Sequence, residues 1–294
     1  MTTPANLSIK WQNTGTGLLQ LFPNNTISSV QVGLIDLGTP PDFGEIPFTA
    51  FQEARVMLDG LSFYGGVFSV AREIVLPLWC RCGSAAGALN QINLIDKWFR
   101  YANLKDMKLT VARDDGSSGT LTTWIRGYMK SRRAFVNFPA PGVGVIGNMA
   151  NGDLLYVVTL VCPYPHLRTT AATSVSGNWT GTSVPKTVTV NGPNPVGLIL
   201  TVTPAVAVTS VTVTNTTTGR YITITDSFAA SVVADWYGTD PDVLTVKRGA
   251  TDLMGNINVG ALLVAQPGDN SFAIHGAGTS FSFDLSWYDS YDSI

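Results

Sequence analysis

The chain has 294 residues, enough for two domains with cores of their own, and 45% of its residues are hydrophobic. Only 13% are charged, about half of the usual share of roughly 25%, and the formal net charge is −2. So small a net charge excludes electrostatic steering toward nucleic acid or an anionic membrane. So few charges indicate a protein that either exposes little surface or buries much of it against partners.

The charge is distributed unevenly along the chain. Residues 1–170 carry 14 Lys and Arg against 11 Asp and Glu, a net of +3, and residues 171–294 carry 4 against 9, a net of −5. The N-terminus lacks the apolar run of a signal peptide, and no stretch reaches the ~18 apolar residues of a membrane span. Cys80, Cys82 and Cys162 are expected to be reduced thiols, since Cys80 and Cys82 are poorly spaced for a disulfide. These features predict a protein made in the cytosol.

In the first half, short strands and Pro/Gly turns lead to a strand predicted at residues 67–79. Its even-numbered positions from Phe68 to Leu78 are apolar apart from Arg72, the alternation of a strand with one buried face. Because Pro77 cannot donate to a ladder, it predicts an edge or a bulge near the end of this strand.

The only helical periodicity in the chain follows, at residues 85–101. At about 3.6 residues per turn, one apolar stripe of this helix consists of Ala88, Ile92, Ile95 and Phe99. A second stripe beside it consists of Leu94, Trp98 and Tyr101. Two interpretations stay open: both stripes belong to a buried core helix, or the second stripe contacts a neighbouring subunit.

The segment DDGSSG, residues 114–119, predicts the turn of a hairpin between two alternating strands. A basic cluster follows, made of Arg126, Lys130, Arg132 and Arg133. Four charges in a half of the chain with a net of +3 are a weak footprint for nucleic acid, so a solvated strand face or a subunit contact is favoured. The Gly-rich stretch at 141–147 is predicted to be a loop, because no helix follows it.

A strand at 153–165 is predicted to end the first domain. The polar, nearly uncharged stretch at 166–183 then predicts a boundary, placed after residue 168. Beyond it, short strands at a spacing of roughly 8–12 residues indicate a β-sandwich. These strands are predicted at 185–191, 196–203, 207–215, 220–225, 242–248, 260–265, 270–275 and 279–287.

No motif for catalysis, a cofactor or a metal is recognisable in the sequence. His166 and His275 lie far apart and have no metal-binding spacing, so the sequence predicts neither an enzyme nor a cofactor. Trp179, Trp236 and Tyr237 are candidates for an aromatic platform that binds a glycan. A core or interface position is the more frequent alternative for such residues.

The order of three segments resembles the distal tail protein family of long-tailed (siphovirus) bacteriophages. LYVVTLVCPYPHLRTT, residues 155–170, is similar to the strand and C-P-x-P-x-x-R junction of that family, although Tyr164 stands where the family often has Asp. VTVTNTTTGRYITI, residues 211–224, is similar to its hairpin with Asn and Gly around the turn. In the segment 242–276, Pro267 to Asn270 matches its Pro-Gly-x-Asn turn.

The resemblance implies a mainly β chain. Residues 1–168 would form a ring-forming domain similar to a tail-tube subunit, a β-sandwich or split barrel with one α-helix, and residues 169–294 a peripheral galectin-like β-sandwich. It also implies a structural, non-enzymatic baseplate-hub protein of the virion tail tip, assembled in the host bacterial cytoplasm as a hexameric ring whose channel passes DNA without binding it specifically.

The partners implied by the resemblance are the tail-tube protein, the tape measure protein and the tail-associated hub protein. Two alternatives stay open. The first is a carbohydrate-binding receptor-recognition module that contacts a host surface glycan. The second is the major tail-tube subunit, which would stack into long polymers instead of a single ring.

Overall fold

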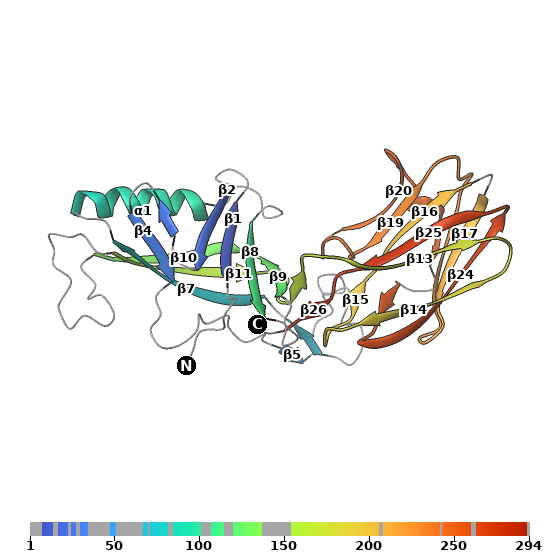
Figure 1. Cartoon of the computed structure of the whole chain (residues 1–294), viewed down its shortest axis with the longest axis horizontal. Helices are drawn as coiled ribbons and strands as arrows, with labels where there is room; N and C mark the ends of the chain where they lie inside the picture. The colour runs from blue at the N-terminus through green and yellow to red at the C-terminus, as the bar shows by residue number, and fades with distance from the viewer. Residues whose placement is uncertain are drawn as a thin grey trace. The chain divides into compact units, whose positions relative to one another are not determined.

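The computed structural model divides the chain into two compact units, each described by itself below (Figure 1). It describes residues 8–13, 17–22, 25–27, 30–34, 48–50, 67–69, 71–81, 85–100, 107–114, 120–136, 154–205, 208–241, 243–259 and 263–292. Unit 1 takes the described residues up to Thr49 and those of 68–167, and unit 2 takes 168–292 with Ala50 and Val67. The change of unit between Leu167 and Arg168 lies beside the boundary expected after residue 168.

Unit 1 contains two antiparallel sheets. In spatial order, the first consists of β2 (Gly17–Phe22), β1 (Ser8–Asn13), β8 (Lys108–Asp114) and β9 (Thr120–Arg126). The second consists of β10 (Tyr128–Val136), β11 (Leu154–Cys162), β7 (Arg72–Arg81), β4 (Val30–Leu34) and β3 (Asn25–Ile27). Strands β8 and β9 pair from Lys108 with Arg126 to Asp114 with Thr120, which confirms the predicted hairpin. The turn at 115–119 lies outside the described residues.

Strand β7 has the buried face that its sequence predicts. Ile74, Leu76 and Leu78 are fully buried, and Arg72 on the same face is only 3% exposed. The guanidinium of Arg72 donates from Nη1 to the carbonyl of Pro165, at 3.2 Å. Pro77 was expected near an edge or a bulge; β7 lies between β11 and β4 and is therefore not an edge strand of its sheet. Pro77 itself pairs with Val157 of β11, whereas the described pairing with β4 covers Leu78 to Arg81.

Helix α1 (Ala85–Phe99) packs on β7 and β10, along one face of their sheet (Figure 1). Ala88, Ile95 and Phe99 have no exposed surface, which confirms most of the first predicted stripe, and Gln91 joins them at 1% exposed. Ile92 is only partly buried. The ring of Phe99 stacks on that of Trp11 from β1, with 4.9 Å between the centroids. The helix therefore packs against side chains from both sheets of unit 1.

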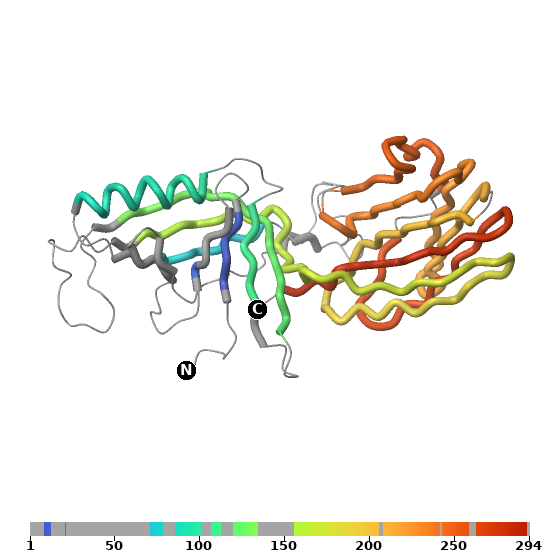
Figure 2. Tube along the Cα trace, turned by 45° about the horizontal axis from the view of Figure 1, so that its top comes forward, coloured from blue at the N-terminus to red at the C-terminus, as the bar shows by residue number. Residues whose placement is uncertain are grey.

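Unit 2 is a β-sandwich of two antiparallel sheets, traced from yellow to red in Figure 2. In spatial order, one sheet consists of β13 (Thr173–Trp179), β25 (Phe281–Trp287), β16 (Ile199–Pro204), β19 (Val232–Trp236), β20 (Leu244–Arg248) and β21 (Thr251–Asp252). The other consists of β14 (Val184–Val190), β24 (Gly268–Gly278), β17 (Val208–Asn215), β18 (Arg220–Thr225) and β22 (Ile257–Val259). Inward-facing side chains of both sheets form one continuous core.

Shorter elements complete the described chain. They are β5 (Phe48–Ala50) paired with β6 (Val67–Ser69), β12 (Leu167–Thr169) next to β26 (Ser290–Tyr291), β15 (Val196–Gly197) paired with β23 (Val264–Ala265), and a 3₁₀ turn at Met254–Asn256. The fold class is therefore mainly β, and the described residues contain one α-helix, α1. This is the fold class that the sequence predicts. Strands β13 and β19 were not predicted.

The β17–β18 hairpin shows why the sequence places Asn and Gly around its turn. The side-chain oxygen of Asn215 accepts hydrogen bonds from the backbone N–H groups of Thr217 and Thr218, at 3.0 and 3.3 Å. Its amide nitrogen donates to the carbonyl of Val264, at 3.0 Å. Gly219 has a φ of +74°, a conformation that glycine adopts at little cost.

Replacing Gly219 by Ala is expected to destabilise unit 2 by about 1 kcal/mol, because an L-residue is strained at positive φ. A Cβ at this position would meet nothing within 4 Å, so a steric clash adds nothing to the cost. Gly255→Ala is the matched control, since its Cβ also has open space and its φ is not positive. Urea unfolding should show a lowered midpoint for Gly219→Ala alone, and an equal loss in both variants would contradict the assignment.

The buried thiol of Cys162 predicts a pH dependence for unit 1. Burial raises the pKa of this thiol to about 12, although the charge of Arg72 opposes the rise. Because the folded-state pKa exceeds the unfolded value of about 8.5, the neutral thiol stabilises the fold fully below that pH. This contribution is lost as the pH rises toward the folded-state pKa.

The free energy of unfolding is therefore expected to fall more steeply above about pH 9 in the native chain than in Cys162→Ala. The difference in slope should approach 1.4 kcal/mol per pH unit at most, on the order of one ionisation. Urea unfolding of both proteins at neutral and alkaline pH measures it. Parallel pH profiles for the two proteins would show that Cys162 does not carry this dependence.

Candidate functional site

The predicted second stripe of α1 is not uniformly buried. Leu94 is 38% exposed, and Leu89, five residues earlier and about 140° around the helix, is 63% exposed. Trp98 is partly buried, and its backbone carbonyl accepts a hydrogen bond from the indole Nε1 of Trp11, at 2.9 Å. Tyr101 lies outside the described residues. Leu94 therefore lies one turn from Trp98, which helps to hold the helix on unit 1, and Leu89 lies on the other flank of the exposed helix surface.

The helix is also tied to the sheet beneath it by charge. Asp96 of α1 forms an ion pair with Arg132 of β10, with 2.7 Å between Oδ2 and Nη2. The hydroxyl of Tyr156, on β11, donates to Oδ1 of the same carboxylate. Burial, followed by this bond to Asp96, raises the pKa of Tyr156 well above its usual value. Tyr156 therefore remains a protonated donor in this cluster.

The basic cluster does not form a continuous positive surface. Arg126 is 2% exposed, and its guanidinium lies 5.9 Å from the centroid of the Trp124 ring. Lys130 pairs with Glu73 on β7, and Arg132 pairs with Asp96. Arg133 remains exposed. Two of the four charges are thus balanced by carboxylates of unit 1, and a third is interior.

The predicted aromatic platform requires correction. Trp236 has no exposed surface and Trp179 is 3% exposed, and both belong to the core of the sandwich. The ring of Trp179 stacks on Phe281, with 5.2 Å between the centroids. A sugar needs an accessible ring face to stack on, so neither indole can provide one here. Both side chains face inward because β13 and β19 are strands, which the sequence pattern did not reveal.

Tyr237, the third platform residue, is partly buried in a tight turn that follows β19. Among the described residues other than glycine, Tyr237 is the one with a positive φ, at +57°. This conformation is strained for an aromatic residue. The carboxylate of Asp235 accepts from the N–H groups of Gly238 and Thr239, at 2.8 and 3.1 Å. Arg168 donates to the carbonyls of Tyr237 and Gly238. These bonds explain how the strained turn is held.

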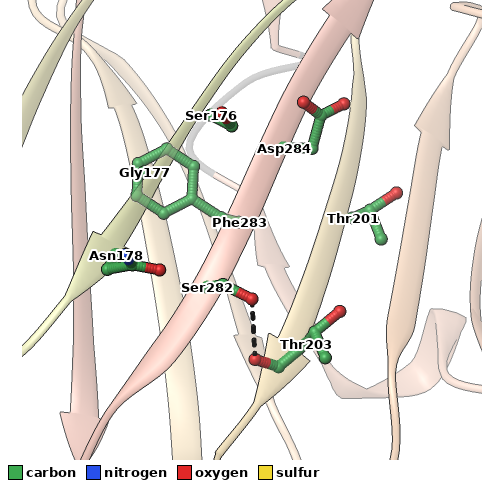
Figure 3. A pocket seen from close by; sticks show the side chains of 8 residues that line it. All are labelled: Ser176, Gly177, Asn178, Thr201, Thr203, Ser282, Phe283 and Asp284. Atoms are coloured by element: carbon green, nitrogen blue, oxygen red, sulfur yellow. Dashed lines mark hydrogen bonds between the residues drawn. The ribbon is translucent and has the colours of Figure 1, made fainter.

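Unit 2 has a shallow polar hollow on the outer face of the sheet formed by β13, β25 and β16 (Figure 3). Its volume is about 340 Å³, and it is lined by Ser176, Gly177, Asn178, Thr201, Thr203, Ser282, Phe283 and Asp284. The polar side chains point outward, whereas Phe283 is 3% exposed and belongs to the core. The sequence FSFDLSW contains this alternation, which was the available signal for an exposed polar face.

Within the part of the chain that the structure describes, no group of three or more His, Cys, Asp and Glu side chains is placed to hold a metal ion. None of the described helices is long and apolar enough to cross a membrane.

The two units define a class of mainly β, two-unit protein in which a helix-bearing unit precedes a β-sandwich. No family model matches the sequence, and no curated protein is similar to it in sequence. The fold is similar to the crystal structure of the SPP1 Dit protein (gp 19.1), described as a paradigm of the hub adsorption apparatus in phages that infect Gram-positive bacteria. The TM-score is 0.55, and the match covers 96% of this chain and 99% of that chain. At 10% identity, the likeness establishes the fold.

Proposed function

We propose that this protein is a structural subunit of a phage tail tip, a distal tail or baseplate-hub protein that joins the tail tube to the host-recognition apparatus. The observation that carries the proposal is a fold similar to SPP1 Dit over nearly the full length of both chains. The order of the junction, hairpin and Pro-Gly-x-Asn segments supports it independently, because these motifs come from the sequence alone. The protein acts as a scaffold and not as an enzyme, and it is located at the virion tail tip after assembly in the host cytoplasm.

In this proposal, residues 1–168 form the ring and residues 169–294 form the peripheral sandwich. The ring is a hexamer that contacts the tail-tube protein on one side and the tape measure and tail-associated hub proteins on the other. The low charge content of 13% supports extensive burial between subunits, because obligate interfaces are larger and more apolar than ordinary protein surface.

The outer side of α1 is the proposed contact between subunits. Leu94 and Leu89 are two of the large hydrophobic residues that the described chain leaves exposed. A leucine on a helix surface gains free energy when a partner removes it from water, by about 25 cal/mol per Å² of apolar surface. The opposite side of the helix is already buried by its own sheets, so the outer side is the one available to a neighbour.

Size-exclusion chromatography with light scattering, followed by negative-stain electron microscopy, tests the proposal on the full chain. Closed single-layer rings, formed alone or with the tail partners, are the expected result. Long stacked tubes would instead identify a major tail-tube subunit. A protein that stays monomeric under all these conditions, including with its tail partners, would contradict a ring-forming role.

A further inference from the structure

The hollow of unit 2 is built from two rows of short polar side chains that cross three strands. The strand register places Ser176, Asp284 and Thr201 opposite one another in the first row. It places Asn178, Ser282 and Thr203 opposite one another in the second. Figure 3 shows these side chains on β13, β25 and β16, around an open space. Short side chains leave the recess open, where long charged ones would cover it.

Much of the hydrogen-bonding capacity of this surface is not used by the protein. Ser282 donates to the carbonyl of Thr203, at 3.4 Å, and the Thr203 hydroxyl lies 3.2 Å from that of Ser231. Among the described residues, the side chains of Ser176, Asn178, Thr201 and Asp284 form no hydrogen bond or ion pair. The hollow therefore presents hydroxyl, amide and carboxylate groups that a ligand can engage.

The charge of the hollow restricts the ligand. Asp284 is the ionisable residue of its lining. The nearest cation along this row of the sheet face is Lys247. Thr201 pairs with Val233, and Val233 pairs with Lys247, so Lys247 lies three strand spacings from Asp284, roughly 14 Å. That distance exceeds the Debye length of about 8 Å at physiological salt. A nearer cation, Lys186 of the opposite sheet, has its Nζ 6.0 Å from the centroid of the Phe283 ring. Asp284 nevertheless forms no ion pair within the described part of the chain. Its unpaired carboxylate disfavours an anionic ligand and favours one that donates hydroxyl hydrogens.

We propose that this hollow binds a neutral sugar unit of a carbohydrate. Each sugar hydroxyl both donates and accepts, which matches a carboxylate acceptor surrounded by Ser, Thr and Asn side chains. The volume of about 340 Å³ falls within the roughly 300–1,000 Å³ of small-molecule sites. Val233, exposed by 41% beside Thr201, offers an apolar contact for sugar C–H groups. A calcium site is disfavoured, because Ca²⁺ takes about six to eight oxygen ligands and the hollow offers a single carboxylate.

The test titrates the full chain with galactose, glucose and N-acetylglucosamine, and with galacturonic acid as the anionic counterpart of galactose. Saturation-transfer NMR and calorimetry measure binding. At least one neutral sugar is expected to bind with a dissociation constant on the order of 1 mM. If galactose binds, galacturonic acid is expected to bind at least about tenfold more weakly than galactose. No binding of any neutral sugar at tens of millimolar, or tighter binding of the acid, would overturn the proposal.

Variants locate the binding. Thr201→Val and Asp284→Asn keep the size of each side chain and should weaken binding about tenfold or more, the loss of one hydrogen bond to a charged or polar partner. Thr187→Val is the matched control, because Thr187 is exposed on β14 of the opposite sheet. Circular dichroism melting verifies that all three are folded. Equal loss in Thr187→Val, or unchanged binding in both hollow variants, would exclude this site.

A final arm distinguishes a free sugar from a polysaccharide. The neutral sugar that binds is compared with a soluble polymer of the same unit. Tighter binding of the polymer, lost in Asp284→Asn, assigns the hollow to a polysaccharide chain, and equal affinity per sugar assigns it to single units. The proposal does not depend on ring formation, so a monomeric chain that binds sugar would contradict the proposed function and leave this inference standing.

Discussion

Replacing Ile95 by Asp is expected to abolish the cooperative folding of unit 1, whereas Leu94→Asp, one residue away, should leave both units folded and prevent ring closure. Ile95 has no exposed surface, and Leu94 is 38% exposed. The same substitution at adjacent helix positions therefore separates a core role from a contact role. Both variants introduce the same aspartate and the same charge into one helix, so these contributions are similar in the two.

The energies of the two substitutions differ widely. Removing a buried isoleucine side chain costs about 2–5 kcal/mol, and burying an uncompensated carboxylate adds several kcal/mol more. The sum is comparable to the whole stability of a domain, about 5–15 kcal/mol. At Leu94 the new carboxylate remains in water, so we expect a loss of about 1 kcal/mol, mostly from partial burial and helix propensity.

Limited trypsin digestion with mass spectrometry measures the folding of each unit separately. Ile95→Asp should be cleaved rapidly at Lys and Arg residues of 72–162, while residues 168–292 stay protected. Leu94→Asp should show native protection throughout and elute without rings. If Leu94→Asp closes rings as the native chain does, the outer side of α1 is not the contact. If it is digested like Ile95→Asp, position 94 belongs to the core.

The first stripe of α1 could be predicted from the sequence because helix periodicity and hydrophobicity agree at Ala88, Ile95 and Phe99. Gln91 was not predicted, since an amide carries no hydrophobic signal and is buried here only through packing. The burial of Arg72 was visible as the one charge on an apolar strand face, but its partner, the carbonyl of Pro165, lies far along the chain. Such partners are set by strand pairing, which local patterns do not encode.

Strand β13 shows the opposite failure. Its sequence TSVSGNW is rich in Ser, Gly and Asn, which favour turns and loops, and it was predicted as part of a boundary region. In the structure, Val175 packs against the core and Trp179 lies within it, because pairing with β25 fixes the register. The same register turns Ser176 and Asn178 outward, into the hollow. The strand and the hollow were therefore missed together, for one reason.

Replacing Asn270 by Ala is expected to destabilise unit 2 by about 3 kcal/mol, since buried backbone groups would lose their hydrogen-bond partner. Asn270 is 1% exposed. Its Oδ1 accepts from the N–H of Gln266, at 2.9 Å, and its Nδ2 donates to the carbonyls of Gln266 and Gly268, at 2.7 and 3.0 Å. A longer contact of 3.5 Å reaches the carbonyl of Val188 on β14.

The neighbouring residue provides the control for this prediction. Asp269 belongs to the same turn, but its carboxylate is exposed and bonds only the hydroxyl of Thr189, at 2.6 Å, among the contacts of the described chain. Asp269→Ala should therefore cost about 0.5 kcal/mol, as for other surface changes. Asn270→Asp should be as harmful as Asn270→Ala, because it keeps the acceptor and replaces the donor with a carboxylate oxygen facing two carbonyls.

Urea unfolding of the full chain, followed by tryptophan fluorescence and compared between each variant and the native protein, measures these differences. With a slope of about 2 kcal/mol per M, the loss in Asn270→Ala corresponds to a midpoint lower by about 1.5 M. Native-like stability in Asn270→Asp would show that the donor bonds of Nδ2 contribute little. In that case the Pro-Gly-x-Asn turn would depend on the acceptor bond to Oδ1 and on backbone conformation, and it would not require the amide donor of Asn.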